Sequence, residues 1–199
     1  VAALPAVERG GVTFGSFSNP AKLGPQIAGP WSRILHHVPG SRLLLKYKGL
    51  GDPMHAERVI AMFATQGIAP NRLVLEEDCP QAELPEHYGR VDIALDPFPY
   101  GGGVTTLEAV WMGVPVVTLP GETFASRHAL THLSTIGLTD TIARDLEEYV
   151  EIAVRLADDL ASLAELRSGL RDRMAASPIC DAERFTDRKS TRLNSSHAN

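Results

Sequence analysis

Short apolar runs alternate along this chain with longer stretches in which apolar residues recur at helical spacing. Five of the runs predict strands, at Val12–Phe17, Ser41–Lys46, Leu73–Glu76, Val91–Leu95 and Pro115–Leu119. Strands that alternate with helices in this way form parallel sheets, because each crossover needs a helix-length connection. The pattern therefore predicts an α/β fold, with a Rossmann-like parallel sheet flanked by helices.

The periodic stretches predict the helices between these strands. The first predicted helix ends at about Val38, and another runs from an N-cap at Ser126 to about Ile136. The others cover His55–Gln66, Glu83–Tyr88, Thr105–Met112, Leu146–Leu156 and Ala161–Met174. Pro30 lies within the first stretch, so that helix either starts there or is kinked. Trp31 and Trp111 fall within helical patterns and are expected in the core. A further short strand is expected near Asp140–Ala143.

Composition narrows the class of protein. The 199 residues are 44% hydrophobic, which is enough for one well-packed domain. A net charge of -5 predicts no general nucleic-acid-binding surface. No apolar run approaches the roughly 18–20 residues of a membrane span, and no signal peptide is recognisable. Cys79 and Cys180 form no CxxC pair, which fits a reducing compartment, so we expect a cytoplasmic domain without a membrane partner.

The last thirteen residues, Asp187–Asn199, differ from the rest of the chain. They are polar, rich in Ser and Asn, and without periodicity. They resemble the peptide produced when a sequencing adapter is translated at the end of a reading frame, and a natural disordered tail is the alternative. We therefore leave them out of the fold prediction.

Candidate chemistry gathers where the predicted strands end. Ligands of open parallel sheets bind outside the carboxyl ends of the strands. Three loops lie at such ends here: Ser18–Lys22, Glu76–Gln81 and Pro97–Thr106.

The third loop has the features of a phosphate-binding turn. Gly101, Gly102 and Gly103 let backbone N–H groups approach an anion closely. Thr105 and Thr106 then open a helix and add hydroxyl donors to its free N–H groups and positive dipole end. The alternative interpretation is a plain glycine-rich turn with a capping threonine.

Two charged residues extend this prediction. Glu108, placed in the first turn of the helix, can accept hydrogen bonds from both hydroxyls of a ribose. Lys22, directly after the first strand loop, can neutralise a diphosphate leaving group. Each residue alone fits an ordinary role, a first-turn acid or a solvated lysine. Lys22 and the glycine loop together, however, are two independent anion-binding features at adjacent strand ends, and they favour an anion site.

Other enzyme classes fit less well. His128 and His132 have i, i+4 spacing, but no Glu follows the first histidine as in a zinc-protease helix. A nicotinamide dehydrogenase would have GxGxxG after the first strand, where this chain has Ser18–Lys22 (SNPAK).

Several separate motifs are similar to one known family. Val91–Leu119 and Pro120–Arg127 (PGETFASR) resemble the C-terminal catalytic lobe of the O-linked N-acetylglucosamine transferases, in particular the bacterial SPINDLY-like branch. Phe14–Lys22 resembles that family's first strand and loop, and Ile142–Leu156 its closing helices. The resemblance implies one lobe of a GT-B architecture, in which two Rossmann-like lobes enclose a nucleotide-sugar donor. Residues 1–10 would then end an inter-lobe segment, residues 11–186 form the lobe, and residues 187–199 form the tail.

The resemblance also implies roles for individual residues. The position of Lys22 contacts the diphosphate and carries the catalytic role, and that of Asn19 faces the donor. The segment that includes Cys79 and Gln81 lies against the nucleoside. The position of Glu108 holds the ribose.

The glycine loop and its two threonines, Thr105 and Thr106, form the family's phosphate turn. The chain departs from the family at Leu84, where a histidine is usual, at Val104, where a threonine is common, and at Gly29-Pro30, which interrupts a normally continuous helix.

The implied reaction is inverting, metal-independent transfer of N-acetylglucosamine from UDP-N-acetylglucosamine, a substrate rather than a cofactor, to Ser or Thr of a protein. Acceptor proteins would bind through an N-terminal lobe and TPR-type repeats, which this sequence does not contain. A GDP-fucose-dependent lobe and a nucleotide-binding module without activity of its own are the alternatives.

Overall fold

The five predicted strands form one parallel sheet. A computed structural model describes residues 1–183 and 186, and the predicted tail at residues 187–199 lies outside this range. The strands follow the order β3-β2-β1-β4-β5, with bounds β1 Thr13–Ser16, β2 Arg42–Lys46, β3 Leu73–Glu76, β4 Ile93–Leu95 and β5 Val116–Val117. The chain leaves β1 toward β2 and β3 on one side and later returns to β4 and β5 on the other. The switch point, where ligands bind in such sheets, therefore lies between β1 and β4.

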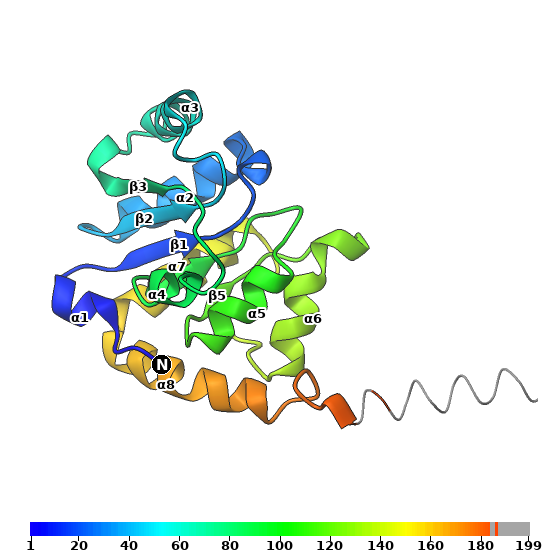
Figure 1. Ribbon diagram of the computed structural model, residues 1–199. Coiled ribbons are helices and arrows are strands. Elements are labelled where there is room, and N and C mark those ends of the chain that lie inside the picture. The colour runs from blue at the N-terminus through cyan, green and yellow to red at the C-terminus, as the bar shows by residue number, and fades with distance from the viewer. Residues whose placement is uncertain (184–185, 187–199) are drawn as a thin grey trace, which may run out of the picture.

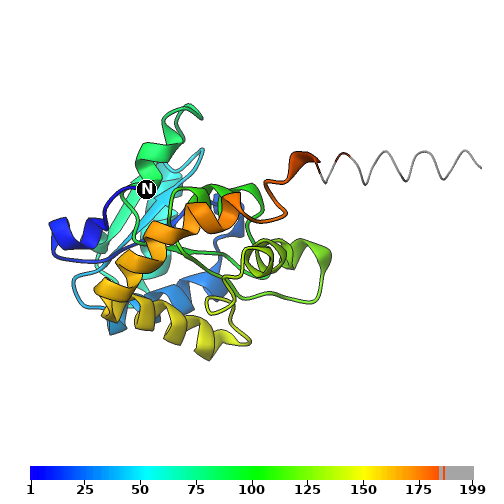
Figure 2. The ribbon, with the colours of Figure 1, turned by 90° about the horizontal axis from the view of Figure 1, so that it is seen from below.

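Two layers of helices cover the sheet (Figures 1 and 2). The helices are α1 Pro5–Arg9, α2 Pro25–His37, α3 Pro53–Ala64, α4 Leu84–Tyr88, α5 Val104–Trp111, α6 His128–Thr135, α7 Leu146–Asp158 and α8 Leu160–Ala175, with 3-10 turns η1 Pro20–Lys22, η2 Pro70–Arg72 and η3 Phe124–Ser126. In Figure 2, which views the domain from below, α8 faces the viewer. No helix within the described residues is long and apolar enough to cross a membrane.

The leucine run of β2 shows how the sheet divides the core. Leu43 and Leu45 pack into a cluster with Trp31 of α2 and Tyr149 of α7. Leu44, between them, points to the opposite face and packs into a second cluster with residues of α4, α5, α6 and α8. Because side chains alternate along a strand, a continuous apolar run fills both faces of a sheet that is covered on both sides.

Two local predictions, for Ser126 and Trp111, are wrong. Ser126 does not cap α6, which begins at His128, because the Ser126 hydroxyl donates to the Thr123 carbonyl oxygen within η3. Of the two alternatives for Pro30, a helix start is excluded, since α2 begins at Pro25 and Pro30 lies inside it. Trp111 is 42% exposed, beneath the guanidinium of Arg171, whereas Trp31 is fully buried as predicted.

The segment predicted as a short strand near residue 142 makes a single bridge to the sheet. Ile142 pairs with Thr118, and the N–H of Ala143 donates to the Thr118 carbonyl oxygen at 2.9 Å. The prediction is therefore confirmed in position, but not as a strand.

A buried charge anchors the first helix to the sheet. The Asp92 carboxylate, fully buried at the start of β4, accepts the N–H groups of Ala6 at 2.9 Å and Thr13 at 2.7 Å. Arg167 of α8, also buried, donates to the carbonyl oxygens of Val91 and Asp92, both at 2.9 Å. Burial raises the pKa of Asp92, and the two N–H groups and Arg167 partly oppose this.

Asp92→Asn should lower the free energy of unfolding by about 2–4 kcal/mol, because asparagine offers one acceptor oxygen to two buried N–H donors. Urea unfolding of both proteins measures this, with the exposed Asp140→Asn as the control. A loss no larger than that of the control would show that the carboxylate does not anchor α1.

Candidate functional site

The loops after β1 and β4 meet at the switch point of the sheet. The β1 loop contains η1 with Lys22, and the β4 loop contains the three glycines and leads into α5. The Lys22 ammonium donates to the Gly101 carbonyl oxygen at 2.9 Å and lies 4.0 Å from the centre of the Tyr100 ring. The structure thus brings together the predicted cation and the predicted phosphate loop.

The carboxylate of Asp96 lies beneath the glycine loop. Asp96 directly follows β4 and is 5% exposed. One carboxylate oxygen accepts the Gly102 N–H at 2.5 Å and the other accepts the Thr118 hydroxyl at 2.7 Å. Its carbonyl oxygen accepts the Tyr149 hydroxyl at 3.0 Å. Asp96 therefore joins the ends of β4 and β5 to the loop.

Close contacts explain two of the three glycines. A Cβ at Gly101 would lie 2.8 Å from Asp96 Oδ2, and one at Gly102 would lie 2.6 Å from Thr105 Oγ1, 2.9 Å from Thr106 Oγ1 and 3.0 Å from Asp96 Oδ1. A Cβ at Gly103 would meet nothing within 4 Å, and none of the three has a positive φ. Gly101 is thus required for close packing over Asp96 and Gly102 for close packing against the two threonines and Asp96, and the Gly102 N–H is already bonded within the protein.

The start of α5 differs in detail from the prediction. Thr106 is buried and its hydroxyl donates to the Gly102 carbonyl oxygen at 3.1 Å, so this side chain closes the loop. Thr105 lines a surface pocket. Because α5 begins at Val104, Glu108 is its fifth residue and lies in the second turn rather than the first.

Glu108 and Gln81, from distant parts of the chain, meet in the lining of this pocket. The pocket has a volume of about 360 Å³ and is also lined by Cys79, Lys46 and Phe17, among others. Gln81 Nε2 donates to Glu108 Oε1 at 2.9 Å, and the Tyr88 hydroxyl lies 3.2 Å from Glu108 Oε2. We call this cavity the Glu108 pocket.

Asn19 has a different environment. Its side-chain oxygen caps η1 by accepting the Ala21 N–H at 2.9 Å. It lines a neighbouring pocket of about 320 Å³ between η1 and α3, together with Lys48 and Arg58. The structure therefore places Asn19 beside the Glu108 pocket rather than in it.

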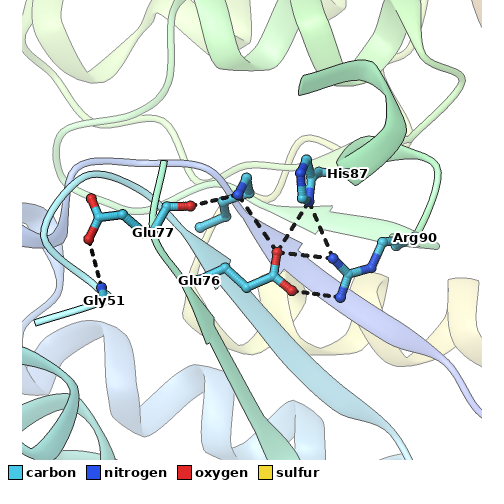
Figure 3. A network of polar contacts seen from close by, with 6 residues as sticks. Gly51, Glu76, Glu77, His87 and Arg90 are labelled. Carbon is cyan, nitrogen blue, oxygen red and sulfur yellow. Dashed lines mark hydrogen bonds and ion pairs between the residues drawn. The ribbon is translucent and has the colours of Figure 1, made fainter. Parts of the chain in front are cut away.

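An ionic network braces the wall of the Glu108 pocket formed by the ends of β2 and β3 (Figure 3). Glu76, the last residue of β3, pairs with Arg90 at 2.7 Å and with His87 Nδ1 at 3.2 Å. The next residue, Glu77, accepts the N–H groups of Gly49 at 2.7 Å and Gly51 at 2.9 Å, which ties the loop after β2 to the end of β3.

Burial shifts the pKa of two groups at the loop. Burial raises the pKa of Asp96 to about 6, although the Thr118 hydroxyl, the Gly102 N–H and the Lys22 charge oppose the shift. Burial lowers the pKa of Lys22, and the nearby Asp96 opposes this change. Within the described residues, no three His, Cys, Asp or Glu side chains gather as a metal site.

Sequence reasoning missed Asp96 and Tyr88. Asp96 carried a usable signal, since it is an acid directly after a buried strand and at the start of the glycine-rich loop. Tyr88 carried none, because its contact with Glu108 depends on how α4 packs against α5.

Comparison with known proteins assigns this chain to a family. The sequence model of glycosyl transferase family 41 matches residues 5–188. The chain belongs to glycosyltransferase family 41. This family 41 chain is 43% identical over 192 residues to the probable UDP-N-acetylglucosamine–peptide N-acetylglucosaminyltransferase SPINDLY of Petunia hybrida, covering 94% of the chain. It is 31% identical over 175 residues to the UDP-N-acetylglucosamine–peptide N-acetylglucosaminyltransferase of Caenorhabditis elegans.

The family 41 chain spans 20% and 15% of these two relatives, respectively. A mutant of the Thermobaculum terrenum O-GlcNAc transferase superposes on it with a TM-score of 0.87 at 38% identity, over 92% of this chain and 35% of that one. Anabaena HepE, solved in complex with UDP, matches with a TM-score of 0.67 at 15% identity, over 94% of this chain and 51% of that one, which is a likeness of fold. The predicted fold, the Rossmann-like lobe of a GT-B glycosyltransferase, is confirmed.

Asp96→Asn should change how stability depends on pH. The folded-state pKa of Asp96, about 6, lies above the ordinary 3.8. Between these pH values the folded protein therefore holds a proton on Asp96 that the unfolded chain has lost. The contribution of Asp96 to stability falls as pH rises through this range. The difference in unfolding free energy between wild type and variant should therefore fall by roughly 2 kcal/mol from pH 4 to pH 7. Urea unfolding across this range measures it, and a constant difference would contradict the assignment.

Proposed function

We propose that this chain is the donor-binding lobe of a protein O-glycosyltransferase that transfers N-acetylglucosamine from UDP-N-acetylglucosamine to Ser or Thr. Family 41 membership and the printed activities of the two relatives support this class of reaction. None of the relatives described above carries a fucosyltransferase name, so they give the GDP-fucose alternative no support. The family resemblance further suggests inverting transfer without a metal.

The contact between Lys22 and the glycine loop carries the proposal. It sets an ammonium beside the loop that leads into α5, where helix N–H groups and a positive dipole end also favour phosphate. The diphosphate is the leaving group of the reaction, and a fixed cation beside it stabilises the charge that develops as the sugar departs. Lys22 would supply that charge.

The Glu108 pocket would hold the nucleoside. It adjoins the same helix start, since Val104 and Thr105 line it, so a diphosphate at the loop and a nucleoside in the pocket can belong to one molecule. The Glu108 carboxylate would accept the ribose hydroxyls, and the segment around Cys79 would lie against the base. Acceptor proteins would bind through other parts of a longer polypeptide, as in the family.

Lys22→Met should weaken UDP binding about 10- to 100-fold, because it removes a charge-assisted hydrogen bond to phosphate. Uridine, which lacks the phosphates, should bind wild type and variant alike. Isothermal titration of both ligands measures this. The control is Arg42→Met, at the first residue of β2 and thus at the other end of the strand from the candidate site. It removes one exposed positive charge and should leave UDP affinity within about threefold.

Failure of wild type to bind UDP at millimolar concentration would overturn the proposed function. If Lys22→Met instead unfolds the domain while UDP binding per folded molecule is unchanged, Lys22 has a structural role.

The chain alone should not transfer sugar, because the family resemblance places the general base and the acceptor site in the other lobe. A radiolabelled transfer assay with UDP-N-acetylglucosamine and Ser/Thr peptides checks this. Turnover above background would contradict a purely donor-binding role.

A further inference from the structure

A buried lysine forms part of the lining of the Glu108 pocket. Lys46 is the last residue of β2, its side chain is only 5% exposed, and it lines the pocket. Neither the sequence motifs nor the loops at the switch point single it out. Burying an ammonium is costly unless its N–H groups find acceptors, so its partners decide what it can do.

Protein groups accept only some of the hydrogen bonds that this ammonium can donate. Nζ donates to the Glu77 carbonyl oxygen at 2.6 Å and lies 3.7 Å from Glu76 Oε2, which is ion-pair rather than hydrogen-bond distance. Glu76 is itself engaged by Arg90 and His87 (Figure 3). Among the described residues, the three N–H groups of this ammonium thus make one hydrogen bond to the protein. The surrounding network holds the ammonium in place.

The position of Lys46 in the sheet fixes which part of a nucleoside it would meet. The order β2-β1-β4 puts Lys46 at the end of β2 and Glu108 on the helix after β4, with Phe17, just beyond β1, between them in the pocket lining. A nucleoside whose ribose binds Glu108 and whose base crosses the pocket would direct the far edge of the base toward Lys46.

We propose that Lys46 reads a keto oxygen on the nucleotide base, an inference that rests on the proposed function of the same pocket. An ammonium has donors and no acceptor, so it can bind the O4 of uracil or the O6 of guanine. The exocyclic amino groups of cytosine and adenine would instead set donor against donor. Lys46 would therefore select keto bases over amino bases, whichever sugar the nucleotide carries.

The test compares UDP with CDP, which differ at this position of the base and share the ribose and diphosphate. Wild type should bind UDP at least about tenfold more tightly than CDP, since the wrong base leaves a buried donor unpaired. Lys46→Met keeps the length and apolar stem of the side chain, and should reduce the ratio to about threefold or less. Titration calorimetry of the 199-residue chain measures both affinities.

The control is Lys48→Met, at an exposed lysine on the rim of the same pocket. Loss of a charge there should weaken UDP and CDP alike and leave their ratio unchanged. A ratio is also insensitive to partial unfolding of a variant, because the inactive fraction lowers the number of sites for both ligands equally.

The outcomes separate the two proposals. If wild type binds UDP but binds CDP equally well, or if Lys46→Met keeps the full ratio, the role of Lys46 is wrong and the proposed function stands. If neither nucleotide binds wild type at millimolar concentration, the proposed function fails and this inference with it. If Lys46→Met does not fold, the wild-type affinities for UDP and CDP still decide, since equal affinities for the two overturn the role of Lys46.

Discussion

The buried carboxylate of Asp96 is the constraint on which the candidate site depends. The carboxylate accepts hydrogen bonds from the Gly102 N–H and the Thr118 hydroxyl. The backbone carbonyl oxygen of Asp96 accepts the Tyr149 hydroxyl, which in turn accepts the indole N–H of Trp31 at 3.0 Å. The glycine loop is thereby linked through the core to α7 and α2. A loop fixed in this way loses little conformational freedom when a ligand binds, which favours affinity.

The same carboxylate makes a cation necessary. A phosphate bound at the glycine loop would be repelled by this buried anion, and the low dielectric of the interior would strengthen that repulsion. Lys22 donates to the carbonyl oxygen of Gly101, the residue that packs directly on Asp96, so its charge lies close to Asp96 and would also lie close to such a phosphate. The loop and the lysine are therefore one electrostatic unit, although they lie 79 positions apart in the chain.

The sequence predicted what depends on local pattern and on sheet topology. Apolar runs located all five strands, and the rule that ligands bind at strand ends anticipated the meeting of Lys22 with the glycine loop. The sequence could not predict contacts that arise only from packing. Gln81 reaches Glu108 because the β3 loop folds over α5, and Asn19 caps its own turn because a short Asx side chain competes for a nearby backbone N–H. Ser126 failed as a cap for the same reason, since its hydroxyl is used within η3.

The Glu108 end of the pocket shows how such internal bonds would shape nucleoside binding. The Glu108 carboxylate has Gln81 on one oxygen and Tyr88 near the other. Tyr88 is buried and stacked on Phe17, with 4.0 Å between ring centres, whereas Gln81 is exposed and can move. A ribose diol would therefore replace the Gln81 amide and keep the Tyr88 contact. Because one hydrogen bond would be exchanged for another, this end would contribute orientation more than affinity, and the affinity would have to come from the diphosphate and the base.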